Sequence, residues 1–293
     1  MLAYSWSLKE DGATYTWAMR NLLCVLSCVL LAAAAASAKV VTRTIEYTHN
    51  GVTLQGYFAF DDAVAGPRPG VLLVHEWWGH NKFVQQKAEE LAAQGYAAFA
   101  LDMYGKGVLV TKPDEAGKLA TPFYTDRTLM RDRAAAGLKV LAEQKEVVAA
   151  PGKPKQLGSM GFCFGGTVSI ELARAGASVV PAGSELSGVI SFHGGLAAGK
   201  GFEAKKDQTK AAILICHGAD DPMVPDAQVK EFTEEMKAAG ADVQVISYSG
   251  TVHSFTNPDA DKVNIPGVKF NASSAKRAWE AMKSFWAERL KSA

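Results

Sequence analysis

The sequence predicts a single α/β domain in which helices cover both faces of a mostly parallel, eight-stranded sheet. Three features indicate this class. Short apolar runs alternate along the chain with longer segments of helical periodicity, and no linker interrupts them. Some runs, such as residues 70–75, are apolar almost throughout, which is typical of strands buried on both faces of a parallel sheet. A G-x-C-x-G motif at residues 161–165 also stands between one such run and a helical segment.

The first half of the chain is expected to begin with a hairpin and continue with a βαβ unit. The first two strands alternate in polarity, and the turn between them contains Asn50 and Gly51, which suit a hairpin. The next strand, helix and strand have the lengths of a βαβ unit, and a short and a long helix follow. The expected strands are 40–47, 54–60, 70–75 and 96–101, and the expected helices are 82–94, 113–120 and 127–144.

The second half repeats the alternation of strand and helix. Its strands are short apolar runs, and its last helix is amphipathic, with Trp279, Met282 and Phe285 on or near one face. The expected strands are 156–160, 188–192, 211–216 and 242–248, and the expected helices are 167–174, 226–239 and 272–290.

Composition narrows the classes of partner. The 293 residues are 48% hydrophobic, which is enough for one large domain with a sizeable core. The charge is nearly balanced, with 31 Lys and Arg against 30 Asp and Glu, and no basic stripe suggests nucleic acid. No metal-ligand spacing, dinucleotide fingerprint or P-loop is present, so we expect neither metal nor cofactor. The expected partner is a small-molecule substrate, and the oligomeric state stays open.

The pattern of residues 1–38 is typical of a secretory signal peptide. Met19-Arg20-Asn21 is a short, positively charged start, residues 22–36 are almost entirely apolar, and Ala36-Ser37-Ala38 is an A-x-A cleavage signal before Lys39. Because residues 1–18 do not fit such a start, Met19 is a candidate for the true first residue. We expect residues 39–293 to be exported to the periplasm or secreted, without stable membrane association after cleavage; an uncleaved N-terminal anchor is the alternative.

Removal of residues 1–38 would also remove Cys24 and Cys28 and leave Cys163 and Cys216. A disulfide between these two cysteines is possible in an exported protein, but it would prevent Cys163 from acting as a nucleophile. We therefore expect two free thiols, with Cys163 reactive and Cys216 buried at the end of a strand.

The motif around Cys163 has the form of the nucleophile elbow of α/β-hydrolases, with cysteine where serine is usual. The nucleophile sits on a strained turn, and glycines two residues before and after it let the strand and helix pass closely. The helix N-terminus carries partial positive charge and favours a thiolate. The alternative for this motif alone is a buried cysteine in a glycine-rich turn.

An acid and a histidine follow the elbow in the chain order of an α/β-hydrolase triad. Asp221 lies just beyond the strand at 211–216, and His253 lies just beyond the last strand. Both candidates therefore fall at the carboxyl ends of strands, where open α/β sheets place their sites. We assign Asp221 as the acid, with Asp220 as the alternative. His75, His193 and His217 are expected to be structural or to line the site.

The chain resembles the dienelactone hydrolase family from about residue 40 to its C-terminus. The cysteine elbow together with Glu76 is the specific part of the resemblance, and the acid and histidine motifs would fit many α/β-hydrolases. The matching segments are residues 74–79, 90–98, 102–104, the elbow, 217–225 and 252–255.

The resemblance implies an α/β-hydrolase fold and a Cys163–His253–Asp221 triad that hydrolyses esters or lactones through an acyl-enzyme. It also implies that Glu76 helps to control the protonation of the thiol, and that the backbone N–H groups of Trp77 and Phe164 bind the oxyanion.

The residues that would bind substrate are less well defined. Trp78 and Phe162 suggest an apolar acyl pocket, with a place in the core as the alternative. Arg127 and Arg131 are candidates to hold a substrate carboxylate, with charges on a helix surface as the alternative. Asn257 stands where dienelactone-cleaving relatives use an arginine, so the chain is expected to act on a different ester or lactone. The alternatives are a thioester or peptide hydrolase, or a binding protein on a hydrolase fold.

Overall fold

The computed structural model describes residues 39–290. The predicted signal peptide therefore lies outside the described residues. Within residues 39–290, no helix combines the length and the apolar character needed to cross a membrane.

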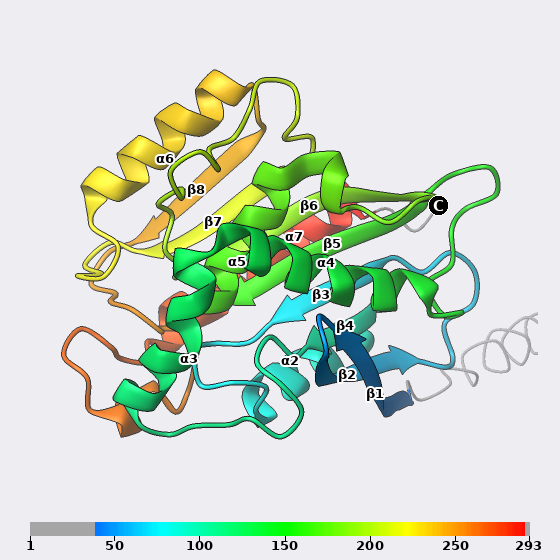
Figure 1. The fold of residues 1–293 in the computed structure, drawn as a ribbon, viewed down its shortest axis with the longest axis horizontal. Coiled ribbons are helices and arrows are strands. Elements are labelled where there is room, and N and C mark those ends of the chain that lie inside the picture. The colour runs from blue at the N-terminus through cyan, green and yellow to red at the C-terminus, as the bar shows by residue number, and fades with distance from the viewer. Residues whose placement is uncertain (1–38, 291–293) are drawn as a thin grey trace, which may run out of the picture. The chain divides into compact units, whose positions relative to one another are not determined.

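Eight strands form one sheet in the order β1-β2-β4-β3-β5-β6-β7-β8 (Figure 1). The β1–β2 hairpin pairs antiparallel and joins β4 antiparallel, whereas all pairs from β4 to β8 are parallel. The predicted eight-stranded, mostly parallel sheet is confirmed. The strands are β1 Val40–His49, β2 Val52–Asp61, β3 Gly70–Val74, β4 Ala97–Leu101, β5 Lys155–Phe162, β6 Ser184–Phe192, β7 Ala212–Gly218 and β8 Val243–Tyr248.

Helices cover both faces of the sheet. The described α-helices are α2 Lys82–Ala92, α3 Pro113–Thr125, α4 Arg127–Glu143, α5 Phe164–Ala175, α6 Asp226–Ala239 and α7 Ala272–Arg289. One core cluster joins Leu72 and Val74 of β3 to helices α3 to α6, and a second joins Val71 and Leu73 to α2 and α7. Successive β3 side chains thus enter opposite cores, which explains the continuous apolar run in the sequence.

Element boundaries differ from expectation where glycine or polar residues blur the pattern. Helix α5 begins at Phe164, directly after Cys163, although Gly165 and Gly166 disfavour a helix. Strand β6 begins at Ser184, four residues early, because its polar first half lies on a partly exposed part of the sheet. Helix α3 extends to Thr125, past Pro122.

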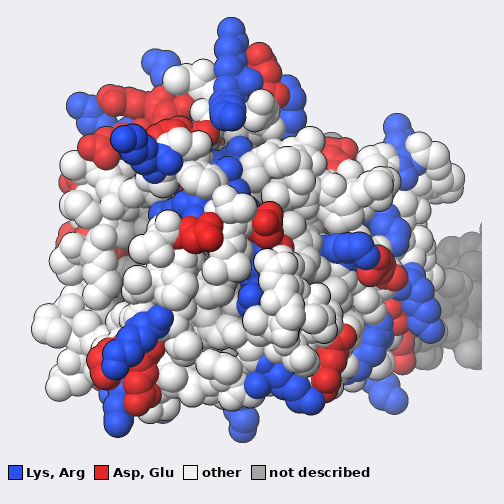
Figure 2. Space-filling view, in the orientation of Figure 1, with Lys and Arg blue, Asp and Glu red and all other residues white. Residues whose placement is uncertain are grey.

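On the face seen in Figure 2, positive and negative side chains are interspersed.

A buried ion network ties α4, α5 and α6 together. Arg174 and Glu171 have no exposed side-chain surface and lie 3.0 Å apart. Arg174 also contacts Glu235 at 2.6 Å and donates to the carbonyl oxygen of Leu196 at 2.7 Å, while Glu171 pairs with Arg131.

We expect Arg174→Met to lower the free energy of unfolding by about 3–5 kcal/mol, because it leaves the carboxylates of Glu171 and Glu235 without their main buried partner. The matched control is Arg289→Met, whose exposed pairs with Asp242 and Glu288 should contribute less than about 1 kcal/mol. Urea unfolding of the two variants beside the unmutated protein measures both. Equal losses in the two variants would contradict the importance assigned to burial.

Candidate active site

Cys163 occupies a strained turn between β5 and α5. Its φ is +52°, in the region that residues with a Cβ rarely adopt. A Cβ on Gly161 would lie 2.0 Å from the carbonyl oxygen of Gly165, and a Cβ on Gly165 would lie 2.2 Å from that of Val74. The strand and helix therefore cross at backbone contact, as the glycine spacing predicts. This crossing holds the half-buried sulfur at the carboxyl end of the sheet.

Residues from neighbouring strand ends converge on this sulfur. Glu76 follows β3, Cys163 follows β5, His193 follows β6, Asp221 follows β7 and His253 follows β8. These strands are parallel neighbours in the sheet, so their carboxyl ends open at one edge. Residues up to 181 positions apart in the sequence are thereby brought into hydrogen-bonding contact.

His253 lies between the sulfur and a carboxylate. Its Nε2 is 3.1 Å from Cys163 Sγ, and its Nδ1 is 2.7 Å from Asp221 Oδ2. The other oxygen of Asp221 accepts the backbone N–H groups of Met223 and Val224 at 2.8 and 3.3 Å. Asp220 is exposed to solvent, so between the two aspartates Asp221 is the one in contact with His253.

The charges around His253 favour its protonated form. Burial lowers the pKa of His253, but the Cys163 sulfur and the Asp221 carboxylate outweigh burial and raise it to about 10. An imidazolium next to a sulfur within hydrogen-bonding distance is the arrangement that stabilises a thiolate.

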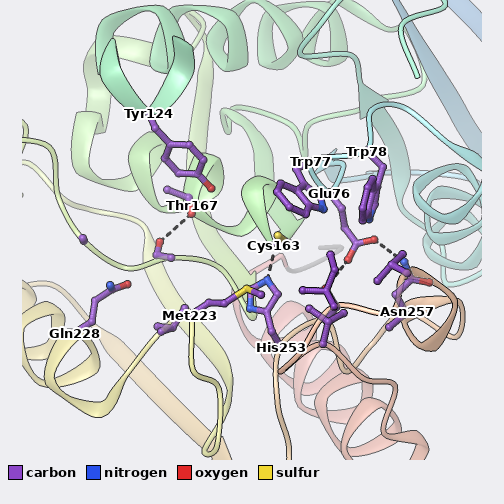
Figure 3. Close-up of a pocket in the computed structure, with 18 of the residues that line it drawn as sticks. Glu76, Trp77, Trp78, Tyr124, Cys163, Thr167, Met223, Gln228, His253 and Asn257 are labelled. Carbon is purple, nitrogen blue, oxygen red and sulfur yellow. Dashed lines mark hydrogen bonds between the residues drawn. The ribbon is translucent and has the colours of Figure 1, made fainter. Parts of the chain in front are cut away.

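Glu76 is buried and held by the loop that carries His253. Ser254 Oγ donates to Glu76 Oε1 at 3.2 Å, and Asn257 Nδ2 donates to Oε2 at 2.5 Å (Figure 3). Burial raises the pKa of Glu76, although Asn257, His253 and Ser254 act in the opposite direction. Asn257, at the position where dienelactone-cleaving relatives have an arginine, thus contacts this carboxyl group.

Two backbone N–H groups are available near the sulfur. Phe164 is the first residue of α5, where N–H groups have no partner within the helix. The N–H of Trp77 makes no hydrogen bond to any other group in the part of the chain that the structure describes. Trp77 lines the cavity that Cys163 opens into, and Phe164 directly follows Cys163, so both N–H groups are candidates to bind a developing oxyanion.

A cavity of about 380 Å³ opens over the sulfur (Figure 3). Its polar lining includes Arg127, Thr167 and Gln228, and its apolar lining is contributed mainly by the segments after β7 and β8. The apolar residues include Trp77, Trp78, Ala197, Met223, Val224, Ala260, Val263, Ile265 and Val268. No group of His, Cys, Asp and Glu within residues 39–290 is arranged to hold a metal ion.

Two predicted substrate-binding residues lie away from this cavity. Phe162 is fully buried and stacks on Phe192 at a centroid distance of 5.1 Å, because it is the last residue of β5 and faces the core. Arg131 pairs with Glu171 at 2.7 Å and donates to the carbonyl oxygen of Phe202. The substrate-binding role assigned to both residues therefore has no support in their positions, whereas Trp78 and Arg127 do line the cavity.

The sequence analysis did not identify Tyr124, Met223 and Thr256 near the site. Tyr124 and Met223 are 41% and 43% exposed at the cavity although both are large and apolar or aromatic. No motif marks Tyr124, which lies at a helix end. Met223 falls within the matching segment 217–225, but nothing in that segment singles it out. Thr256 does fall three residues after His253, so its proximity could have been inferred from that spacing alone.

The two described cysteines are expected to differ in reactivity. Burial raises the pKa of Cys216 to about 12, and its sulfur lies within the core, whereas Cys163 borders the cavity beside His253. Iodoacetamide at neutral pH should therefore alkylate Cys163 and leave Cys216 unmodified until the protein is denatured. Peptide mapping by mass spectrometry identifies the modified cysteine, and Cys163→Ser should abolish the native-state modification. Modification of Cys216 at a comparable rate would contradict this assignment.

Comparison with known proteins agrees with the geometry. The family model described as "Dienelactone hydrolase family" matches residues 54–290. A relative from Aquifex aeolicus (strain VF5), whose name carboxymethylenebutenolidase is provisional, is 30% identical over 85% of this chain and 99% of its own length. A solved dienelactone hydrolase-like promiscuous phosphotriesterase from metagenomic libraries is 35% identical, with a TM-score of 0.77 over 86% of this chain and 99% of that one.

A more distant structure, esterase 2 of Thermogutta terrifontis, shares the fold alone, with 17% identity and a TM-score of 0.55 over 84% of this chain and 94% of that one. The family model matches nearly the whole described chain and assigns it to this family. The same match, together with the names of the relatives, supports carboxylic ester hydrolysis as the class of reaction. The chain belongs to the dienelactone hydrolase family.

Proposed function

We propose that the protein hydrolyses carboxylic esters or lactones by acyl transfer through Cys163, His253 and Asp221. One observation carries the proposal: the hydrogen-bonded line from sulfur to imidazole to carboxylate, with distances of 3.1 and 2.7 Å, which begins at a strained elbow and faces the cavity. A nucleophile, a base and a group that orients the base are the three parts that covalent acyl transfer needs.

In the first half of the reaction, the Cys163 thiolate attacks the carbonyl carbon and forms a carbon–sulfur bond. The N–H groups of Trp77 and Phe164 donate to the oxyanion, and one such donor is typically worth about 3–4 kcal/mol in the transition state. The tetrahedral intermediate then collapses, and the bond to the leaving oxygen breaks. The protonated His253 gives its Nε2 proton to the leaving alcohol or enol.

In the second half, water replaces the leaving group. The thioester sulfur carries no charge, so the strongest influence that raises the pKa of His253 disappears when Cys163 is acylated. The neutral imidazole can then take a proton from water, whose oxygen attacks the thioester carbonyl. Collapse releases the carboxylic acid and restores the thiolate and imidazolium, while Asp221 keeps the ring oriented through Nδ1.

Glu76 has a supporting role in this proposal. Its raised pKa favours an uncharged carboxyl group, which avoids a second negative charge beside the thiolate. Ser254 and Asn257 hold the group in place on the side of the cavity next to Trp77 and Trp78 (Figure 3). The family resemblance assigns it control of the protonation state of the thiol.

The central experiment is hydrolysis of a panel of p-nitrophenyl esters, enol lactones, a thioester, a peptide amide and paraoxon by the unmutated protein, Cys163→Ala and Cys216→Ala. The phosphotriester is included because the metagenomic relative is described as a promiscuous phosphotriesterase. We expect ester or lactone turnover that Cys163→Ala abolishes and Cys216→Ala retains, and no amide cleavage, because thiolates suit esters with good leaving groups.

The outcomes separate the competing functions. Turnover that survives in Cys163→Ala would refute the covalent mechanism. A preference for the thioester or the amide would favour the related hydrolases, and the absence of turnover on every substrate would favour a binding protein.

Arg127 is the proposed contact for an acidic substrate. Its side chain is 8% exposed and lines the cavity, and its Nε has no hydrogen-bond partner among residues 39–290. Its remaining contacts, with Met130 Sδ and the carbonyl oxygen of Ala197 at 3.4 Å each, are long. A buried guanidinium without a carboxylate partner is suited to bind one from the substrate.

We expect Arg127→Met to raise KM for an ester that carries a free carboxylate by about 10- to 100-fold, the range of one charge-assisted contact. The matched control is the corresponding uncharged methyl diester, for which KM should change little. Steady-state kinetics on the pair of substrates measures the difference, and an equal effect on both substrates would refute carboxylate binding by Arg127.

A further inference from the structure

His193 lies between the elbow and the loop that carries His253. It directly follows β6, and its side chain is 1% exposed. Its backbone φ of +43° is unusual for a residue with a Cβ, and its N–H donates to the carbonyl oxygen of Cys216 at 2.9 Å. The ring is thus held at a fixed position under the site rather than in the cavity.

The two nitrogens of this ring contact two parts of the site. The backbone N–H of Cys163 is shared between the carbonyl oxygen of Phe192 at 3.0 Å and Nδ1 at 3.1 Å, and Nε2 lies 2.7 Å from Thr256 Oγ1. A backbone N–H can only donate, so Nδ1 must be the acceptor and the ring proton must reside on Nε2. Nε2–H therefore donates to the threonine hydroxyl, and the ring carries no charge in this arrangement.

The neighbouring charges agree with a neutral ring. The His193 and His253 rings lie edge to face with their centroids 5.2 Å apart. Burial, and then the charge of His253, lower the pKa of His193 well below its usual range. The two histidines therefore hold opposite protonation states: His253 charged beside the sulfur, and His193 neutral behind it.

Thr256 belongs to the same short loop as His253. Within this loop, His253 contacts Asp221, while Ser254 and Asn257 contact Glu76. The bond from His193 to Thr256 adds a link between this loop and the backbone of Cys163. It thereby connects the two partners of the 3.1 Å contact between sulfur and imidazole from the side away from the cavity.

We propose that His193 is a positioning residue that fixes His253 over the Cys163 sulfur by bridging the elbow backbone and Thr256 with its neutral ring. The inference rests on the proposed function in that the His253–Cys163 pair performs the acyl transfer. His193 itself touches neither the substrate nor the reacting atoms, and acts through the separation and angle of that pair.

The test combines two single variants and the double variant. Thr256→Val removes the acceptor hydroxyl at nearly constant volume. His193→Asn can keep the contact with the elbow but is too short to reach Thr256. Each single variant should lower kcat for the best ester by about 10- to 100-fold, the range for a misplaced catalytic pair, with KM little changed. Iodoacetamide alkylation of Cys163 at pH 7 should slow as well, because a displaced imidazolium stabilises the thiolate less.

Two comparisons separate positioning from general structural damage. The double variant should be no slower than the slower single variant, since both singles break the same bond. Thr256→Ser, which restores the hydroxyl, should recover most of the activity lost in Thr256→Val. The matched control is Thr209→Val, at a buried threonine that does not line the cavity, and it should leave kcat and alkylation unchanged.

Each outcome bears on the proposal. Unchanged kcat and alkylation in folded Thr256→Val would overturn it, as would multiplying losses in the double variant or a lowered melting temperature without a change in kcat. If His193→Asn fails to fold, the comparison of Thr256→Val with Thr256→Ser decides. If the unmutated protein hydrolyses none of the esters, the proposed function fails, and the alkylation rates still test the positioning of His253 over the thiol.

Discussion

The site depends on the contact between α5 and β5 at Gly161 and Gly165. No side chain separates the two backbones there, so the chain must turn within one residue, and Cys163 takes a positive φ. The strain is sustained by the centre of the sheet, where β5 pairs with β3 on one side and β6 on the other. The same pairing aligns the ends of β3 and β6 with that of β5, and Glu76 and His193 follow these two strands.

Much of the fold could be predicted from the sequence because its local signals agree with one another. Two-sided burial produces apolar strands such as β3, and the Asn-Gly turn identifies the hairpin. Predictions were less accurate where a tertiary constraint overrides local preference. Helix α5 starts on Phe164 because the elbow requires it there, although Gly165 and Gly166 disfavour a helix. Strand β6 begins among polar residues because its neighbour β5 continues alongside them.

The chemistry of the site was predictable to the extent that motifs mark it. The sequence indicates Cys163, Asp221 and His253 by their order along the chain and by their positions just after strands. The contact of Asn257 with Glu76 is not, because it joins loops 181 positions apart and no local pattern encodes it. Phe162 and Arg131 show the converse limit. Composition near the motif suggested a pocket, but Phe162 faces the core and Arg131 pairs with the buried Glu171.

The spread of the site along the chain has a consequence for when its chemistry exists. Cys163 and His253 are 90 positions apart and meet only after the last three strands have docked. Without β8 in place, the thiol lacks the imidazole beside it. A local opening of the C-terminal third would therefore be enough to separate the imidazole from the sulfur while most of the sheet stays intact. The contact between thiol and imidazole is thus only as stable as the docking of this last part of the chain.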